Sequence, residues 1–149
     1  MNFALKTLCT TGSYRIDVPQ DTAEDVEDDV VSLWRKQQSV LLKISSHRRH
    51  MGTQMSAESR LKARLEKEKF IQSLDVNLPT FDVPDFAASG GIDNDRVNWI
   101  HCYWVWADLA LYITISWSAP DSIEVTGQWA IAALKSLRRN YQPTTESPN

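Results

Sequence analysis

The 149-residue sequence predicts an α+β fold in which helices pack against an antiparallel β-sheet. Three observations lead to this prediction. Residues 97–117 have the alternation of a long hairpin, residues 30–34 and 40–45 have that of a second hairpin, and residues 57–70 and 123–139 have helical patterns. We expect one domain over residues 1–141, since a chain of this length buries roughly 70% of its unfolded surface, and a disordered tail over residues 142–149.

The first strands are predicted by alternation and by turn residues. Residues 14–18 alternate and stop at Pro19, which indicates a strand followed by a turn. Residues 20–29 are acidic and poor in large apolar side chains, with Val26 as the exception, so they fit a short helix or a loop. The second hairpin has its turn at residues 35–39, and residues 47–54 form a polar connection after it.

The middle of the chain predicts one helix and two irregular segments. Ser56 is a suitable N-cap for the helix at residues 57–70, where Glu58 and Lys62 form an i,i+4 pair. Pro79 and Pro84 interrupt residues 74–86, which we interpret as an extended edge segment. Residues 87–96 contain two adjacent glycines and then acidic and amide residues, which is typical of a loop.

Residues 97–117 carry the strongest strand pattern, in two halves separated by a short break at residues 107–108. Side chains on one face of its first half are Trp99, His101, Tyr103 and Val105, and those on the other are Ile100, Cys102, Trp104 and Trp106. One face is core, while the other has more aromatic and polar surface than a solvated face needs. We therefore expect the protein to act through a surface. The helix at residues 123–139 follows, with Asp121 or Ser122 as its N-cap.

Charge is unevenly distributed along the chain, although the net charge is only −3. Residues 17–29 contain seven acidic residues and no base, whereas residues 35–69 contain ten Lys or Arg against three acidic residues. Residues 70–130 contain eight acidic residues against Arg96 alone. Such separation favours steered association with a charged partner, although the basic block also fits the solvated face of a helix.

The histidine, glycine, acidic and cysteine patterns of the sequence predict no catalytic residue, no cofactor and no metal. His47 and His50 lie beside two arginines, which would repel a metal cation. The glycines at positions 90 and 91 precede no helix, and Asp93 and Asp95 lack the glutamate that completes a calcium loop. Cys9 and Cys102 form no metal or redox motif, and Cys102 is interpreted as a buried apolar side chain, while a disulfide between the two stays open. We therefore expect a protein that is not an enzyme.

Residues 14–65 resemble the start of small bacterial proteins with a Mog1/PsbP-like fold. In these proteins a strand ending in Val-Pro leads through an acidic segment to a hairpin, a polar turn and a helix. The second half is similar to theirs as well: an aromatic strand, a strand of the type LYITISW, and a helix ending near Ser-Leu-Arg at residues 136–138. The resemblance covers about residues 14–139 and implies the fold more specifically than it implies a function.

This fold recurs in oxygen-evolving-complex subunits, in a nuclear-transport factor for a small GTPase and in bacterial immunity proteins. The resemblance therefore implies a non-catalytic immunity protein that neutralises a cognate toxin, for example a type VI secretion effector, by occluding its active site or substrate channel. If the toxin is a nuclease, an acidic surface can mimic the charge of nucleic acid. The candidate partner-binding residues are acids and tryptophans: Asp93, Asp95, Trp99, Trp104, Trp106, Asp121, Glu124, Glu24, Glu27 and Asp28.

Two other functions stay open. The same sheet face could belong to a general protein-binding accessory module, and His47, Arg48, Arg49 and His50 could bind a small anion or a metal. Each candidate acid could also be merely solvated, and each candidate tryptophan could belong to the core. We expect no nucleic-acid partner, because the rest of the chain is acidic, and no membrane contact. A cytoplasmic location is expected, and the oligomeric state stays open.

Overall fold

Ten β-strands and two α-helices make up the described part of the computed structural model, which covers residues 4–36, 38–48, 55–74, 85–118, 122–123 and 126–140. In chain order they are β1 (Leu5–Leu8), β2 (Tyr14–Pro19), β3 (Ala23–Glu27), β4 (Val30–Trp34), β5 (Leu41–Arg48), α1 (Ala57–Leu65), β6 (Phe70–Leu74), β7 (Asp85–Asp93), β8 (Val97–Val105), β9 (Leu109–Ser118), α2 (Gln128–Ser136) and β10 (Arg138–Arg139).

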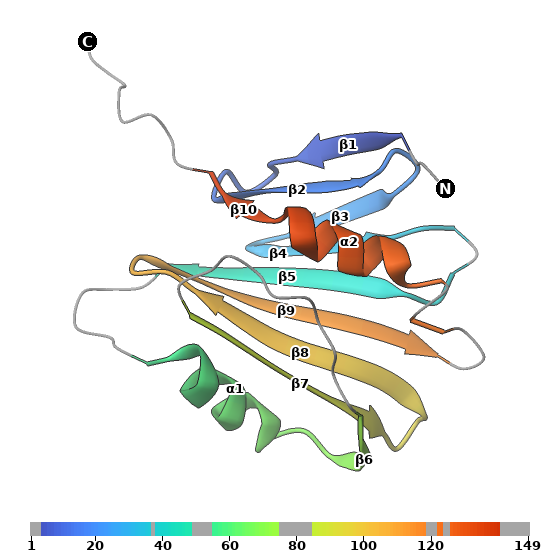
Figure 1. Ribbon diagram of the computed structural model, residues 1–149, viewed down its shortest axis with the longest axis vertical. Helices are drawn as coiled ribbons and strands as arrows, with labels where there is room; N and C mark the ends of the chain where they lie inside the picture. Colours follow the sequence, from blue (N-terminus) through green and yellow to red (C-terminus); the bar gives the residue numbers. More distant parts are fainter. Residues whose placement is uncertain are drawn as a thin grey trace.

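A seven-stranded sheet occupies the centre of the molecule, in the order β3-β4-β5-β9-β8-β7-β6 (Figure 1). A smaller sheet, in the order β1-β2-β10, lies beside it. Every strand pair in the described residues is antiparallel. The α+β class, with a mostly antiparallel sheet and two helices, is therefore confirmed.

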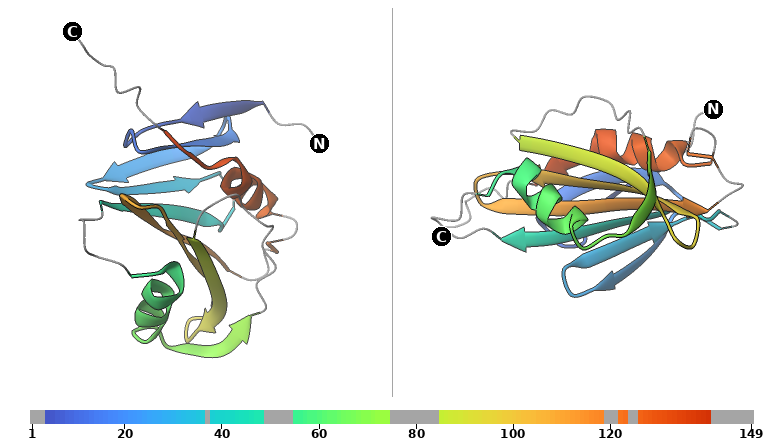
Figure 2. Two further views of the ribbon diagram at one scale, coloured as in Figure 1. Left: turned by 60° about the vertical axis from the view of Figure 1, so that its left-hand side comes forward. Right: turned by 90° about the horizontal axis from the view of Figure 1, so that it is seen from below.

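The main core lies between one face of the seven-stranded sheet and a layer formed by α2 and the smaller sheet (Figure 2). Its centre is the apolar row of β9, where Leu111, Ile113 and Ile115 are fully buried. Strand β2 contributes Ile16 and Val18 from the other layer. The period-2 alternation of these strands places every second side chain in this core, and burial of each large aliphatic side chain contributes about 1.5–3 kcal/mol.

A second, smaller cluster lies on the opposite face of the sheet, where α1 packs over β7 and β8. Ala57 and Leu61 of the helix are buried there against Tyr103 and Val105. Ser56 caps the helix as predicted, since its hydroxyl oxygen accepts a hydrogen bond of 3.1 Å from the backbone N–H of Ser59.

The predicted long hairpin is confirmed as β8 and β9. Its register pairs Ile100 with Ile115 and Trp104 with Leu111, so the apolar row of each strand points to the main core. The strand at residues 14–18 and the hairpin of β4 and β5 are confirmed too, although β5 continues to Arg48 and includes the first two residues of the expected polar connection. Strand β1 was not expected.

Two predictions of irregular structure are wrong. Residues 20–29, interpreted as a helix or loop, contain β3, which is hydrogen-bonded to the apolar strand β4. Because β3 is an edge strand that is exposed on both faces, its sequence needs no alternation of apolar and polar residues. Residues 87–96, interpreted as a loop, lie mainly in β7. Gly91 lets the Phe70 ring pack closely against β7, because a Cβ at this position would overlap that ring.

Both helices are shorter than predicted. Helix α1 ends at Leu65, and Phe70 begins β6 instead of ending the helix. Helix α2 begins after Gly127, so Ser122 is not its N-cap, and the expected last turn contains β10, which pairs with β2. Three expected features lie outside the described residues. They are the alternative N-cap at position 121, most of the extended segment (residues 75–84), and the tail at residues 142–149.

Candidate functional site

One face of the seven-stranded sheet lacks a covering helix over β4 and β5 in the described part of the chain, and we call it the open face. It is the face opposite α2, beyond the part of β7 and β8 that α1 covers. The pairing register places Trp34, Leu41, Ser116 and Trp99 side by side in one row across it. Three strand spacings separate the two tryptophans, a distance of about 14 Å.

This row exposes apolar surface. Trp34 is 37% exposed, and Leu41 and Trp99 are half-buried. Between them Ser116 lies below the large side chains, with 8% exposure. Tryptophans held on a rigid sheet are the side chains that most often dominate the energy of a protein interface.

Asp93 fixes the position of Trp99. One carboxylate oxygen accepts hydrogen bonds from the backbone N–H groups of Asp95 (2.9 Å) and Val97 (3.0 Å), and the other accepts the indole N–H of Trp99 at 2.9 Å. These donors, with the Trp99 indole first, lower the pKa of the Asp93 carboxyl below its usual value. Asp93 therefore organises the β7–β8 turn and its tryptophan, while Asp95 is exposed beside it.

Strands β3 and β4 form an acidic hairpin at the other side of the open face, which we define as residues 23–34. Asp28 and Asp29 form its two-residue turn, and Asp28 has a φ of 56°, a conformation that aspartate tolerates better than most residues. Exposed acidic side chains on this hairpin are Glu24, Asp25, Glu27, Asp28 and Asp29. Because the register pairs Ala23 with Trp34, the acids at positions 25 and 27 share the face of that tryptophan.

The floor beside Trp99 is a cluster of aromatic rings around His101, which is 2% exposed. The imidazole lies between Trp99 and Tyr112, with ring centroids 5.6 and 5.8 Å away, and its Nδ1 shares a hydrogen bond with the Tyr112 hydroxyl. Burial, together with the nearby Arg64 charge, lowers the pKa of His101 to about 4. The ring is therefore neutral at pH 7, and its Nε2 has no partner in the described residues.

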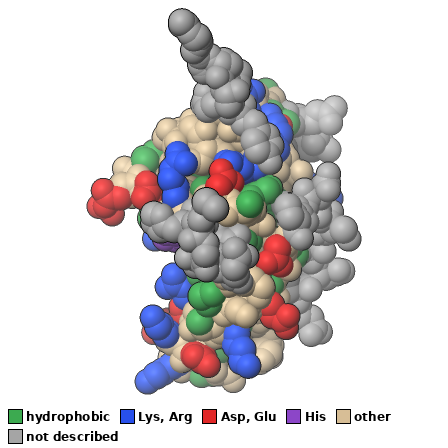
Figure 3. Space-filling model, turned by 90° about the vertical axis from the view of Figure 1, so that its left-hand side faces the viewer, with side chains coloured by type: hydrophobic (Ala, Val, Ile, Leu, Met, Phe, Trp, Pro, Cys, Tyr) green, Lys and Arg blue, Asp and Glu red, His purple; other side chains and the backbone are tan. Residues whose placement is uncertain are grey.

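A basic side chain lies against the end of the open face that is farther from the acidic hairpin. The guanidinium of Arg64 on α1 lies 4.3 Å from the centroid of the Tyr112 ring. Figure 3 shows this side of the molecule in profile, with acidic side chains on a projection at the upper left and both basic and acidic side chains below. The open face is thus apolar along one row, with the acidic hairpin at one end and side chains of both charges, Arg64 and Asp95 among them, near the other.

The sequence-predicted site residues do not all gather here. Asp93, Asp95 and Trp99 lie at one end of the apolar row, and Glu27 and Asp28 lie on the acidic hairpin at the other. Glu24 points to the opposite side of β3, where its carboxylate accepts a hydrogen bond from the Thr10 hydroxyl.

The other predicted tryptophans pack into the main core. Trp104 is 1% exposed and out of reach of a partner, and Trp106 packs against the same cluster. Asp121 and Glu124 lie outside the described residues, as do Arg49 and His50 of the basic cluster. His47 is exposed near the end of β5. Within the described residues no three His, Cys, Asp or Glu side chains gather where they could hold a metal ion.

Sequence reasoning missed Trp34. The signal was present, because Val31 and Leu33 belong to the core and Trp34 follows in the opposite phase of the same strand. Together with the pairing of β4 and β5, this phase places Trp34 on the sheet face that α2 does not cover.

Comparison with known proteins gives a fold and no family. No family model matches the sequence, and no curated protein matches it. A crystal structure of a protein from Bacteroides thetaiotaomicron VPI-5482 is similar, with a TM-score of 0.57 and 11% sequence identity. The match covers 96% of this chain and 51% of that one, so this chain spans about half the length of the similar protein. No helix in the described residues is long and apolar enough to cross a membrane. The likeness concerns the fold alone.

Proposed function

We propose that this protein is a non-catalytic immunity protein with a Mog1/PsbP-like fold, which binds a cognate bacterial toxin in the cytoplasm and occludes its active site or substrate channel. The binding surface is the open face together with the acidic hairpin. The apolar row from Trp34 to Trp99 supports this proposal most directly, since it leaves two tryptophans on a rigid sheet without a covering element in the described residues.

The hot-spot energy of such a surface comes from its aromatic anchors. The Asp93 carboxylate holds the Trp99 indole, so this ring loses little conformational freedom when a partner packs on it. Trp34 lies at the other end of the apolar row and is the more exposed of the two. Truncation of one such anchor typically costs 2 kcal/mol or more of binding free energy, which is roughly a thirtyfold loss of affinity.

The acidic hairpin supplies the charge. Its exposed carboxylates at positions 25, 27, 28 and 29 project from the edge of the sheet. A substrate channel that binds nucleic acid is basic, so a nuclease toxin is the effector class that this hairpin fits best. Complementary charge of this kind accelerates association and makes it sensitive to salt.

The test begins with a pull-down from the native bacterium, using the tagged protein and mass spectrometry of what is retained. The retained protein is then purified, and inhibition of its activity by this protein is titrated. We expect stoichiometric inhibition, a loss of affinity of roughly thirtyfold for Trp34→Ala, and slower association for Glu27→Lys.

Two matched variants serve as controls. Leu5→Ala removes an apolar side chain that is 57% exposed on β1, and Glu58→Lys reverses an exposed charge on α1. Both should inhibit like the wild type. Full inhibition by Trp34→Ala and Glu27→Lys would exclude the open face as the binding surface, and a retained protein whose activity is unaffected would refute the immunity function.

A further inference from the structure

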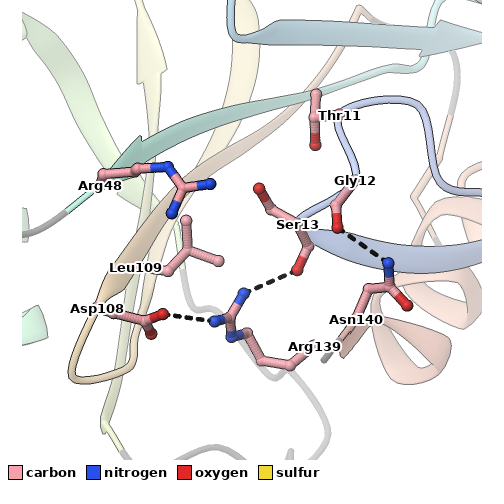
Figure 4. A pocket seen from close by; sticks show the side chains of 8 residues that line it. All are labelled: Thr11, Gly12, Ser13, Arg48, Asp108, Leu109, Arg139 and Asn140. Carbon is pink, nitrogen blue, oxygen red and sulfur yellow. Dashed lines mark hydrogen bonds and ion pairs between the residues drawn. The ribbon is translucent and has the colours of Figure 1, made fainter. Parts of the chain in front are cut away.

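A pocket of about 400 Å³ lies away from the open face, where the two sheets meet. Four segments that are distant in sequence form it: the β1–β2 loop with Thr11, Gly12 and Ser13, the end of β5 with Arg48, the β8–β9 turn with Asp108 and Leu109, and the chain after α2 with Arg139 and Asn140 (Figure 4). This volume lies in the range of about 300–1,000 Å³ that is typical of small-molecule sites.

Among the described residues three charged side chains line the pocket, and two of them neutralise each other. Arg139 donates a hydrogen bond of 2.8 Å to a carboxylate oxygen of Asp108 and one of 2.9 Å to the backbone carbonyl of Ser13. The side chain of Arg48 has no hydrogen bond or ion pair with any residue in the described part of the chain. The pocket therefore has one positive charge that the described residues do not balance.

Neutral donors lie opposite this charge. Figure 4 shows the Arg48 guanidinium extending toward the β1–β2 loop and the side-chain oxygens of Thr11 and Ser13 on the loop side of the same space. A guanidinium facing hydroxyl groups is a common arrangement for phosphate and carboxylate oxygens, because all of these groups donate hydrogen bonds and the guanidinium supplies the charge.

The walls are fixed before any ligand binds. Arg139 has its side chain 12% exposed, and its guanidinium lies 5.8 Å from the centroid of the Trp106 ring. Asn140 donates from its side chain to the backbone carbonyl of Gly12 at 2.9 Å and accepts from Arg15 at 3.0 Å. Gly12 has a φ of 80°, a conformation that favours glycine. A loop held in this way loses little entropy on binding.

We propose that this pocket binds a small oxyanion, the phosphate or carboxylate group of a small molecule, through Arg48 with the hydroxyl groups of Thr11 and Ser13. The site is separate from the open face and does not depend on the proposed toxin binding. Arg48 supplies the charge, Arg139 neutralises the Asp108 carboxylate, and the size of the pocket leaves room for the remainder of the ligand.

The experiment is a titration of the ¹⁵N-labelled protein with sodium phosphate and, separately, sodium acetate, at constant ionic strength set with sodium chloride. We expect saturable amide shifts at residues 11–13 and 108–109 with at least one of the two anions. The stronger of the two identifies whether the ligand carries a phosphate or a carboxylate. Arg48→Gln should weaken this binding about tenfold or more, since it removes a charged hydrogen-bond donor.

Lys43→Gln is the matched control, because it removes one positive charge from the same strand at an exposed position that does not line the pocket. It should bind the anion like the wild type, which separates a local site from the general effect of net charge. The proposal is overturned if the wild type shows no saturable shifts with either anion, or if Arg48→Gln binds as tightly as Lys43→Gln.

Discussion

The buried imidazole of His101 should make the stability of the protein depend on pH. Its pKa is about 4 in the folded protein and 6.5 in the unfolded chain, and burial of the ring is the main cause of this difference. Between these values the unfolded chain binds a proton that the folded protein does not. The stabilisation is therefore complete above pH 6.5 and is lost as the pH falls toward 4.

The magnitude follows from the two pKa values. Their difference corresponds to about 3 kcal/mol in full, of which most develops between pH 7 and pH 4.5. Trp99 on one side of the imidazole is only half-buried, so solvent screens part of this energy. We therefore expect His101→Phe to remove about 2 kcal/mol of pH dependence over this range.

The assay is urea unfolding followed by tryptophan fluorescence at pH 7, 6, 5 and 4.5, for the wild type and His101→Phe. The quantity of interest is the difference in the free energy of unfolding between the two proteins, because carboxylates titrate equally in both. His47→Gln, at an exposed position on β5, is the control and should follow the wild type. A difference that stays constant from pH 7 to pH 4.5 would refute the assignment of a neutral, desolvated imidazole.

Three further outcomes follow from the core and from the cap of α1. Both cysteines are free; Cys9 is exposed, whereas burial raises the pKa of the Cys102 thiol to about 12. A thiol reagent at pH 8 should therefore label Cys9 at once and Cys102 only after unfolding. Rapid labelling of both cysteines in the native protein would contradict this. Trp104→Ala should lower the free energy of unfolding by about 3–5 kcal/mol in urea titrations, because the side chain is 1% exposed; a loss below 1 kcal/mol would place the ring outside the core. Asp85→Ala should cost about 1 kcal/mol, since its carboxylate accepts the backbone N–H of Ala57 at 2.8 Å, and hydrogen exchange should show α1 opening more often while α2 is unchanged.

The parts of the fold that the sequence predicted are those in which local pattern and tertiary packing agree. Strands β8 and β9 alternate along their whole length, so Cys102 and Ile113 meet in the core as the pattern indicates. Strand β3 could not be predicted in this way, because it is stabilised by pairing with β4 and has no apolar row of its own. Likewise, β7 contains a glycine whose role is to make room for Phe70, a residue that lies in another strand.

The candidate site was predictable only in part for the same reason. The aromatic pattern of β8 predicted Trp99 as a site residue. Which of the neighbouring tryptophans reach the surface depends on the sheet face that each helix covers. Helix α2 and the smaller sheet bury the side that carries Trp104, and α1 leaves Trp99 near the surface. Trp34 joins it only through the pairing of β4, β5 and β9, which the sequence does not specify. The pocket around Arg48 likewise combines segments that have no common motif.

The smaller sheet also affects the order in which the protein folds. Strand β2 pairs with β10 between Arg15 and Arg138, and the Ser136 hydroxyl accepts a hydrogen bond of 2.8 Å from the backbone N–H of Asp17. Asp17 and Ser136 are 119 positions apart in the sequence, and bringing together residues so far apart is slow compared with forming a hairpin. During synthesis, the apolar side of β2 stays uncovered by α2 until that helix has left the ribosome. During this interval the exposed apolar side of β2 is open to wrong association.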